Sequence, residues 1–166
     1  MQKKQSNIKL RRAVIEDLPE IRKVFVESIN AICAKDYNSE QLNVWTAGIK
    51  NEERWLNKIK NQYFLVAEFD KRIAGFGSLD KGYYIDFMYV HQDYQGKGIA
   101  GILLTALEKE SQRYKTRVLK SDVSKTAVSF FKKKGFEIIK EQKKFFNGIE
   151  IDNFKMEKIL NFPSAG

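Results

Sequence analysis

Apolar residues recur at helical spacing over the first third of the chain, after a short segment with strand-like alternation. Residues 8–13 alternate weakly and predict a first strand. The helix that follows ends near Lys35, and Asp17 and Glu20 have the spacing of a capping box at its start. Its apolar stripe consists of Leu18, Ile21, Val24, Phe25, Ile29 and Ile32. Residues 39–59 predict two shorter helices.

The pattern then changes to strands rich in aromatic and branched residues. Three such runs cover residues 63–69, 72–79 and 84–90, and short turns join them. Consecutive strands with short connections pair as an antiparallel meander. The sequence therefore predicts that these three strands are neighbours in one sheet.

A helix, a strand, a second helix and a hairpin are predicted in the rest of the chain. The first helix follows a glycine cluster, and residues 116–123 and 124–134 predict the strand and the second helix. Asn147-Gly148 is a strong hairpin signal within residues 136–159. This order predicts an α/β (α+β) fold with a mixed, mostly antiparallel central sheet flanked by helices. It disagrees with a doubly wound fold, in which strands and helices alternate.

Composition indicates a folded protein of a reducing compartment, which we expect to be the cytoplasm. A length of 166 residues with 43% hydrophobic residues suits one domain, expected over residues 1–160, with a tail at 161–166. The N-terminal lysines precede no apolar run, and no segment reaches the ~18 apolar residues of a membrane span. Cys33 and His91 are single residues of their types, so we expect no disulfide and no metal site.

The net charge of +9 favours an anionic partner, such as nucleic acid, a membrane surface or a polyphosphate cofactor. Basic residues are spread along the chain, and the densest run is Lys132–Lys134. A solvated basic face explains this distribution better than dedicated nucleic-acid binding, because no nucleic-acid motif accompanies it. A basic nucleic-acid-binding module nevertheless stays as an alternative.

The glycine cluster has the chemistry of an anion site. It consists of Gln95, Gly96, Lys97, Gly98, Ile99, Ala100 and Gly101. Free N–H groups and the dipole at a helix start attract phosphate, glycines let it approach the main chain, and Lys97 adds positive charge. The spacing of a Walker A loop is absent. Gly96, Gly98 and Gly101 also match the dinucleotide fingerprint, with Asp122 as a candidate ribose-binding acid.

Two motifs give the cluster a more specific interpretation. The first motif is [Gln/Arg]-x-x-Gly-x-[Gly/Ala], and Gln95, Gly98 and Ala100 match it. It resembles the acetyl-CoA loop of the GNAT N-acetyltransferase superfamily. Residues 124–136 resemble the family's N-x-x-A-x-x-F-Y-x-x-x-G-F signature through Ala127, Phe130, Gly135 and Phe136. Ser124 and Phe131 depart from it, because the signature has asparagine and tyrosine there.

The resemblance implies an enzyme that transfers the acetyl group of acetyl-CoA directly to an amine of a small molecule or protein. Backbone N–H groups from Gly96 to Gly101 would hold the pyrophosphate, and backbone groups of Met88, Tyr89 and Val90 would pair with the pantetheine arm. The residues expected along the other side of the cofactor are Ser124, Ala127, Phe130 and Phe131. Homodimers are common in the family, whereas a membrane partner is not expected.

Asp86 is the candidate catalytic base. An amine acceptor is mostly protonated at neutral pH and must lose a proton before it reacts. Asp86 lies on the central strand where some family members have a glutamate, and the two-residue period places it on the face of Met88 and Val90. A role as an ion-pair partner is an equally good interpretation of Asp86.

The general acid is not assigned by the sequence. Phe131 cannot protonate a leaving thiolate, so Tyr84, Tyr89 or solvent would do so, or turnover is slow. A CoA-binding domain without catalysis is therefore a further alternative. Candidates for acceptor contact in the family's variable region are Tyr37, Trp45 and Trp55, although packing is the simpler explanation for each.

Overall fold

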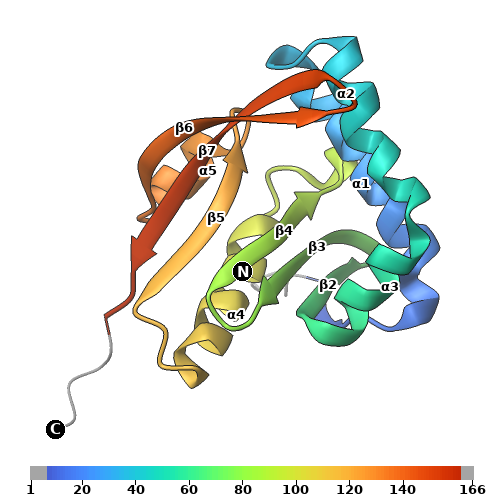
Figure 1. Ribbon diagram of the computed structural model, residues 1–166. Helices are drawn as coiled ribbons and strands as arrows, with labels where there is room; N and C mark the ends of the chain where they lie inside the picture. Colours follow the sequence, from blue (N-terminus) through green and yellow to red (C-terminus); the bar gives the residue numbers. More distant parts are fainter. Residues whose placement is uncertain (1–6, 162–166) are drawn as a thin grey trace, which may run out of the picture.

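The computed structural model describes residues 7–161, which form a mixed sheet with helices on both faces (Figure 1). Within these residues seven strands have the spatial order β1-β2-β3-β4-β5-β7-β6. They are β1 (Ile8–Arg12), β2 (Tyr63–Phe69), β3 (Arg72–Asp80), β4 (Tyr84–Val90), β5 (Val118–Ser124), β6 (Glu137–Phe146) and β7 (Ile149–Ile159). Neighbouring strands are antiparallel except β4 and β5, which confirms the predicted mixed, mostly antiparallel sheet. The N-terminal lysines and most of the expected tail lie outside the described residues.

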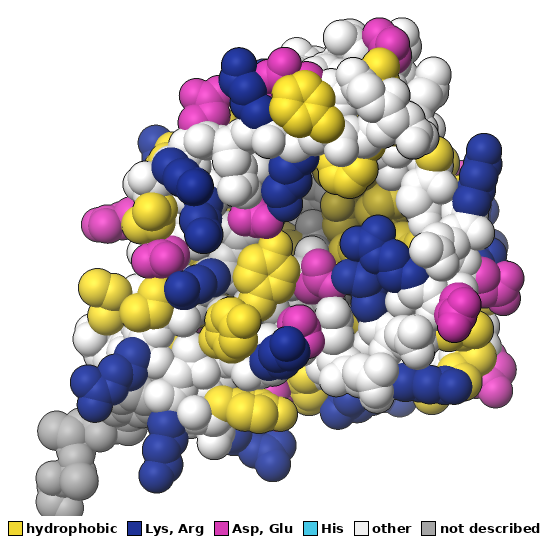
Figure 2. Space-filling view, viewed as in Figure 1, with side chains coloured by type: hydrophobic (Ala, Val, Ile, Leu, Met, Phe, Trp, Pro, Cys, Tyr) yellow, Lys and Arg dark blue, Asp and Glu magenta, His cyan; other side chains and the backbone are white. Residues whose placement is uncertain are grey.

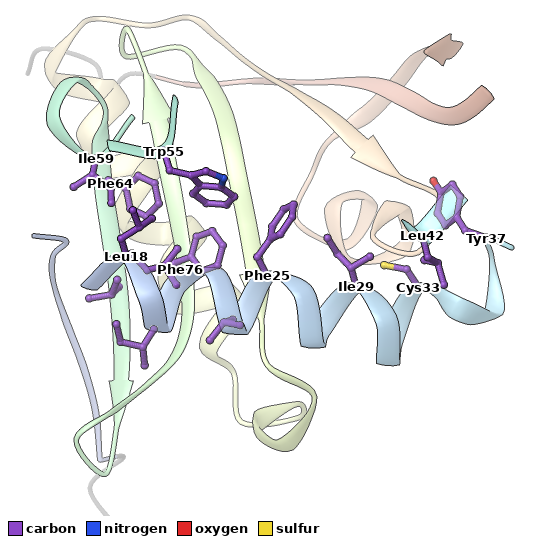
Figure 3. Close-up of a cluster of buried hydrophobic side chains, with 14 of the residues drawn as sticks. Leu18, Phe25, Ile29, Cys33, Tyr37, Leu42, Trp55, Ile59, Phe64 and Phe76 are labelled. Carbon is purple, nitrogen blue, oxygen red and sulfur yellow. The ribbon is translucent and has the colours of Figure 1, made fainter. Parts of the chain in front are cut away.

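Two groups of helices cover the two faces of the sheet. They are α1 (Leu18–Ile32), α2 (Ser39–Thr46) and α3 (Glu52–Asn61) on one face, and α4 (Ile99–Arg113) and α5 (Val128–Lys133) on the other. Strand alternation supplies both cores, because Phe64 and Val66 of β2 face the first group while Leu65 and Ala67 face the second. Figure 3 shows α1 directing its apolar side chains against the rings of the first face.

Tertiary contacts replace the capping box that the sequence predicts at the start of α1. The carboxylate of Asp17 accepts two hydrogen bonds from the Arg11 guanidinium, at 2.7 and 2.8 Å, and one from the Val14 amide at 2.8 Å. Glu20 accepts instead from the amide of Ile73 in β3, at 2.9 Å. The bonds from Arg11 hold the pKa of Asp17 below its ordinary value, although burial opposes this shift.

The last third of the chain follows the prediction with one change. The helix predicted over residues 124–134 is shorter, because Ser124 still belongs to β5 and α5 begins at Val128. The hydroxyl of Ser124 accepts a hydrogen bond from the amide of Ala127 at 3.3 Å. The hairpin forms as predicted, and Asn147 and Gly148 have φ angles of 49° and 76°. Positive φ at both turn residues is the geometry that an Asn-Gly turn favours.

The parallel strands β4 and β5 separate soon after they begin to pair. Their register contains Tyr84 opposite Lys120 and Ile85 opposite Ser121, and nothing beyond within residues 7–161. β5 pairs along its whole length with β7, and Figure 1 shows β4 and β5 diverging. The later part of β4 therefore has a backbone edge without a strand partner in the described chain.

A β-bulge in β4 sets the direction of the Asp86 side chain. Two consecutive residues of β3, Ser78 and Leu79, lie opposite Phe87 and Ile85. Asp86 is the extra residue, and the two-residue alternation breaks there. The carboxylate pairs with Lys58 of α3, whereas Met88 and Val90 pack in the core beside α4. The prediction that Asp86 shares the face of Met88 and Val90 was therefore wrong.

Candidate active site

The glycine cluster begins α4 and lines a groove, here called the loop groove. Gly96 and Gly98 have φ angles of 75° and 79°, which glycine adopts without strain. The first hydrogen bond of α4 joins the Ile102 N–H to the Gly98 carbonyl at 3.1 Å. The N–H groups of residues 99–101 have no partner in the described part of the chain, so this helix start can bind an anion. The groove is lined by Val90, Tyr94, Gln95, Gly96, Gly98, Ile99, Ala100, Gly101, Ile102, Thr105, Phe130, Lys133 and Lys134.

Positive charge reaches the loop groove from α5 and the turn that follows it. Lys97 lies with its ammonium 5.0 Å from the centroid of the Phe69 ring and is not among the lining residues. Lys133 and Lys134 line the groove, and the Lys134 ammonium lies 3.5 Å from the position that a Cβ on Gly101 would occupy. Folding thus brings part of the densest basic run to the start of α4.

The loop groove continues into a middle groove between β4 and β5. The two share Val90, Gln95, Ala100 and Phe130. The middle groove has a volume of about 200 Å³, and its further lining includes Met88, Tyr89, Ser124, Ala127 and Phe131. The structure therefore brings every predicted cofactor residue except Lys97 to one of these two connected grooves.

Backbone groups of β4 point toward the middle groove at alternate residues. The His91 N–H donates to β3 at 2.8 Å, and antiparallel pairing then directs the backbone of Tyr89 to β3 and that of Met88 and Val90 away from it. The Val90 carbonyl accepts from Gln95 Nε2 at 2.9 Å. The remaining groups that face the groove are the Val90 N–H and both polar backbone groups of Met88. Of the three predicted residues, Tyr89 is the one whose two backbone groups are directed to β3.

A third space, here called the carboxylate pocket, adjoins the middle groove. It has a cavity volume of about 200 Å³ and borders the middle groove at Trp45, Met88, Tyr89, Ser124, Ala127 and Phe131. Figure 2 shows the hollow on this face, with charged side chains around it and hydrophobic side chains inside. Its acidic residues are Asp86 and Asp122. The two carboxylates differ in how many of their oxygens already have partners.

Asp86 has one oxygen bonded and one oxygen open. Its Oδ2 pairs with the ammonium of Lys58 and accepts from Gln62 Nε2 at 2.8 Å. Its Oδ1 accepts no hydrogen bond within residues 7–161. Asp86 is thus the ion-pair partner that the sequence allowed, and it also keeps an acceptor for another donor.

Asp122 is held by residues that are distant in the sequence. Its oxygens accept from the Tyr84 hydroxyl at 3.0 Å, Gln142 Nε2 at 2.7 Å and Lys144 Nζ at 2.6 Å. Burial opposes the charge, but bonds from Lys144 and Gln142 outweigh it and keep the pKa of Asp122 below its ordinary value. Asp122 lines the carboxylate pocket and not the loop groove, so the dinucleotide interpretation fails.

The group around Asp122 was missed because no short motif joins its members. They lie on β4, β5 and β6, and the register of four strands brings them together, because β7 lies between β5 and β6. Tyr37 and Trp45 also line the carboxylate pocket, while Trp55 is 3% exposed in the core. The Tyr37 hydroxyl donates to the Asp152 carbonyl at 2.7 Å, and burial raises its pKa to about 12.

His91 is held by hydrogen bonds, and Phe131 packs against the core while it lines both the middle groove and the carboxylate pocket. His91 Nε2 lies 2.6 Å from a carboxylate oxygen of Glu27, and its Nδ1 accepts the Asp93 amide at 3.1 Å. The ring of Phe131 is 3% exposed and lies 5.0 Å from the ring of Phe136. Cys33 is buried, and burial raises the pKa of its thiol.

No three His, Cys, Asp or Glu side chains within residues 7–161 gather closely enough to hold a metal ion. No helix in the same range is long and apolar enough to cross a membrane.

A comparison with known protein domains identifies the family of this fold. Residues 33–160 match the acetyltransferase (GNAT) domain family, so this chain belongs to the GNAT family, whose cosubstrate is acetyl-CoA. It is an acetyl-transferring enzyme. The divided, mostly antiparallel sheet and the glycine loop at the start of α4 agree with this membership.

Individual relatives resemble the chain over nearly its whole length. A GCN5-related N-acetyltransferase from Rhodopseudomonas palustris is 31% identical, with a TM-score of 0.91, over 96% of this chain and 100% of that one. The PaiA N-acetyltransferase of Thermoplasma acidophilum, solved in complex with coenzyme A, is 26% identical, with a TM-score of 0.76, over 92% and 99%. The uncharacterized N-acetyltransferase YafP of Escherichia coli K12 is 28% identical over 91% of this chain and 95% of its own.

Proposed function

We propose that the protein transfers the acetyl group of acetyl-CoA directly to the nitrogen of an amine, and that the three connected spaces hold the two substrates. One observation carries this proposal. The anion-binding loop groove leads through the middle groove to a pocket with an open carboxylate oxygen. The cofactor would enter through the loop groove and the amine through the carboxylate pocket. The two would meet at the residues that line both the middle groove and the carboxylate pocket.

The grooves fit the chemistry of acetyl-CoA from end to end. The free N–H groups of residues 99–101 bind the pyrophosphate, and Lys133 and Lys134 add positive charge beside it. The backbone groups of Met88 and Val90 pair with the amides of the pantetheine arm, as an added strand does. The other wall is formed by Ala127, Phe130 and Phe131. Ser124 lies where the middle groove and the carboxylate pocket join.

Asp86 is the proposed base. The protonated amine first gives one proton to Oδ1 of Asp86, directly or through a water molecule. The free amine then attacks the thioester carbonyl carbon, a C–N bond forms and the C–S bond breaks. The nitrogen gives up a second proton to solvent as the amide forms, and the leaving thiolate takes up a proton. Asp122 is less suitable because three donors already occupy its oxygens.

Tyr89 is the proposed donor of a proton to the leaving thiolate. Its side chain borders both the middle groove and the carboxylate pocket, and burial raises the pKa of its hydroxyl, which keeps it protonated. The hydroxyl of Tyr84, the other candidate, already donates to Asp122. Tyr89 therefore takes the role that Phe131 cannot fill.

The test is the Asp86→Asn variant, assayed by release of CoA with a panel of amines. We expect kcat to fall at least about a hundredfold, while calorimetry shows unchanged affinity for acetyl-CoA. Asp93→Asn is the matched control, because the Asp93 side chain is 77% exposed. Full activity of Asp86→Asn across pH would remove Asp86 from the mechanism. Binding of acetyl-CoA without turnover of any amine by the unmodified protein would favour a non-catalytic domain.

Two further expectations concern the cellular compartment and the oligomeric state. The single cysteine suits a reducing compartment, and we place the protein in the cytoplasm on that ground. A homodimer stays a prediction, which light scattering coupled to size-exclusion chromatography checks.

A further inference from the structure

A second apolar cavity, here called the aromatic pocket, opens beside the carboxylate pocket. It has a cavity volume of about 190 Å³, and the rings that line it are Phe25, Trp45, Trp55, Phe87, Tyr89 and Phe146. Trp45, Tyr89 and Phe146 also line the carboxylate pocket, so the two cavities adjoin. A molecule that presents an amine to Asp86 can therefore place another of its groups in the aromatic pocket.

The walls of the aromatic pocket are flat and already packed. Trp55 and Phe87 are stacked with their centroids 4.8 Å apart and their planes 1° from parallel. Phe25 meets Trp55 edge-on at 5.1 Å and Tyr89 at 5.0 Å, and Figure 3 shows Phe25 rising from α1 toward Trp55. Such walls suit a planar ring, which makes stacked and edge-on contacts with them.

Cationic groups also line this pocket. Arg54 and Lys58 lie one turn apart on α3, so their side chains share a face of the helix. Lys58 is paired with Asp86, whereas the guanidinium of Arg54 has no hydrogen bond or ion pair within residues 7–161. A guanidinium presents a planar pair of donors that matches a carboxylate, and it repels a second cation. The ligand class is therefore a ring compound with a carboxylate, and not a polyamine.

The position of Asp86 indicates where the amine of the ligand would lie. Lys58 links Asp86 to the helix that carries Arg54, so a base and a carboxylate-binding group lie on adjacent parts of the site. An α-amino acid carries its amine and its carboxylate on one carbon, and its side chain leaves from the same atom. These three groups correspond to Asp86, Arg54 and the aromatic pocket.

We propose that the acetyl acceptor is an aromatic α-amino acid, with its ring in the aromatic pocket, its carboxylate on Arg54 and its α-amine facing Asp86. This inference rests on the proposed function, because the amine must meet the thioester in the carboxylate pocket. The products are an N-acetyl amino acid and CoA, and the first proton lost by the amine goes to Asp86.

The first experiment compares kcat/KM for L-phenylalanine, 2-phenylethylamine and L-alanine with saturating acetyl-CoA. The second compound keeps the ring and amine without the carboxylate, and the third keeps the amine and carboxylate without the ring. We expect L-phenylalanine to exceed each of the others at least tenfold. A 2-phenylethylamine value equal to or above that of L-phenylalanine overturns the assignment of Arg54.

Two variants test the two parts of the acceptor separately. Arg54→Gln should raise KM for L-phenylalanine at least tenfold and leave 2-phenylethylamine unchanged, whereas Lys60→Gln, on the same helix and outside the pocket lining, should alter neither. Gly48 lines the pocket, and a Cβ added there meets nothing within 4 Å. Gly48→Leu adds bulk at this lining position with no clash at its Cβ, so it should impair both ring compounds. An unchanged preference in Arg54→Gln, or full activity in Gly48→Leu, contradicts the proposal.

Binding measured without turnover separates this inference from the proposed function. Trp45 and Trp55 line the aromatic pocket, so L-phenylalanine should change their fluorescence saturably in the unmodified protein and not in Gly48→Leu. If acetyl-CoA binds and other amines are acetylated without this preference, the acceptor assignment alone fails. If acetyl-CoA does not bind and no amine is acetylated, the proposed function fails and the acceptor assignment with it.

Discussion

Ala100→Leu tests whether the loop groove binds the cofactor. Ala100 is the second residue of α4 and lines both the loop groove and the middle groove. Leucine is also a good helix former and requires no unusual backbone angle, so the helix should form as before. The larger side chain would fill the space in front of the N–H groups of residues 99–101. We expect acetyl-CoA binding to weaken while the fold is kept.

The size of the effect follows from the hydrogen bonds that would be lost. A bond from an N–H to a charged group contributes about 1.5–3 kcal/mol, so displacement of the phosphate from two N–H groups costs about 3–6 kcal/mol. Since about 1.4 kcal/mol corresponds to a factor of ten, the dissociation constant should rise by about two to four orders of magnitude.

The assay is calorimetric titration with acetyl-CoA, together with a thermal unfolding curve for each protein. Lys109→Leu is the matched control, because it adds the same side chain to an exposed position of the same helix. The control should bind acetyl-CoA as the unmodified protein does, and both variants should unfold near the unmodified midpoint. A dissociation constant for Ala100→Leu within about threefold of the unmodified value, with the fold intact, would refute the assignment of the loop groove.

Two further predictions concern stability. Phe76 is 0% exposed, and its ring lies 5.7 Å from that of Phe64, so Phe76→Ala should lower the free energy of unfolding by about 3–5 kcal/mol in denaturant titration. Bonds from Arg11 lower the pKa of Asp17 in the folded state, so this carboxylate stabilises the fold above its unfolded pKa, and the contribution is lost as the pH falls through the folded value. Asp17→Asn should therefore lower stability at pH 7 and show a smaller loss than the unmodified protein on acidification below about pH 4.

Local patterns in the sequence determined the elements of the fold and one end of the site. Runs of aromatic and branched residues identified the meander strands, and Asn147-Gly148 identified the hairpin, because residue preference and turn chemistry act over a few residues. The cluster from Gln95 to Gly101 indicated the anion site for the same reason, since a helix start and its glycines need no distant partner. The family resemblance, which the domain match confirms, came from these short segments.

Tertiary structure decided which side chains meet in the site. The bulge at Asp86 depends on how β4 pairs with β3, so a two-residue period read from β4 alone placed this side chain on the wrong face. Lys134 reaches the start of α4, and Lys144 reaches Asp122, across gaps in sequence that no local pattern spans. The sequence by itself determined where strands, helices and turns form, because backbone preferences are local. The identity of each partner was decided by strand register and packing, which depend on the whole chain at once.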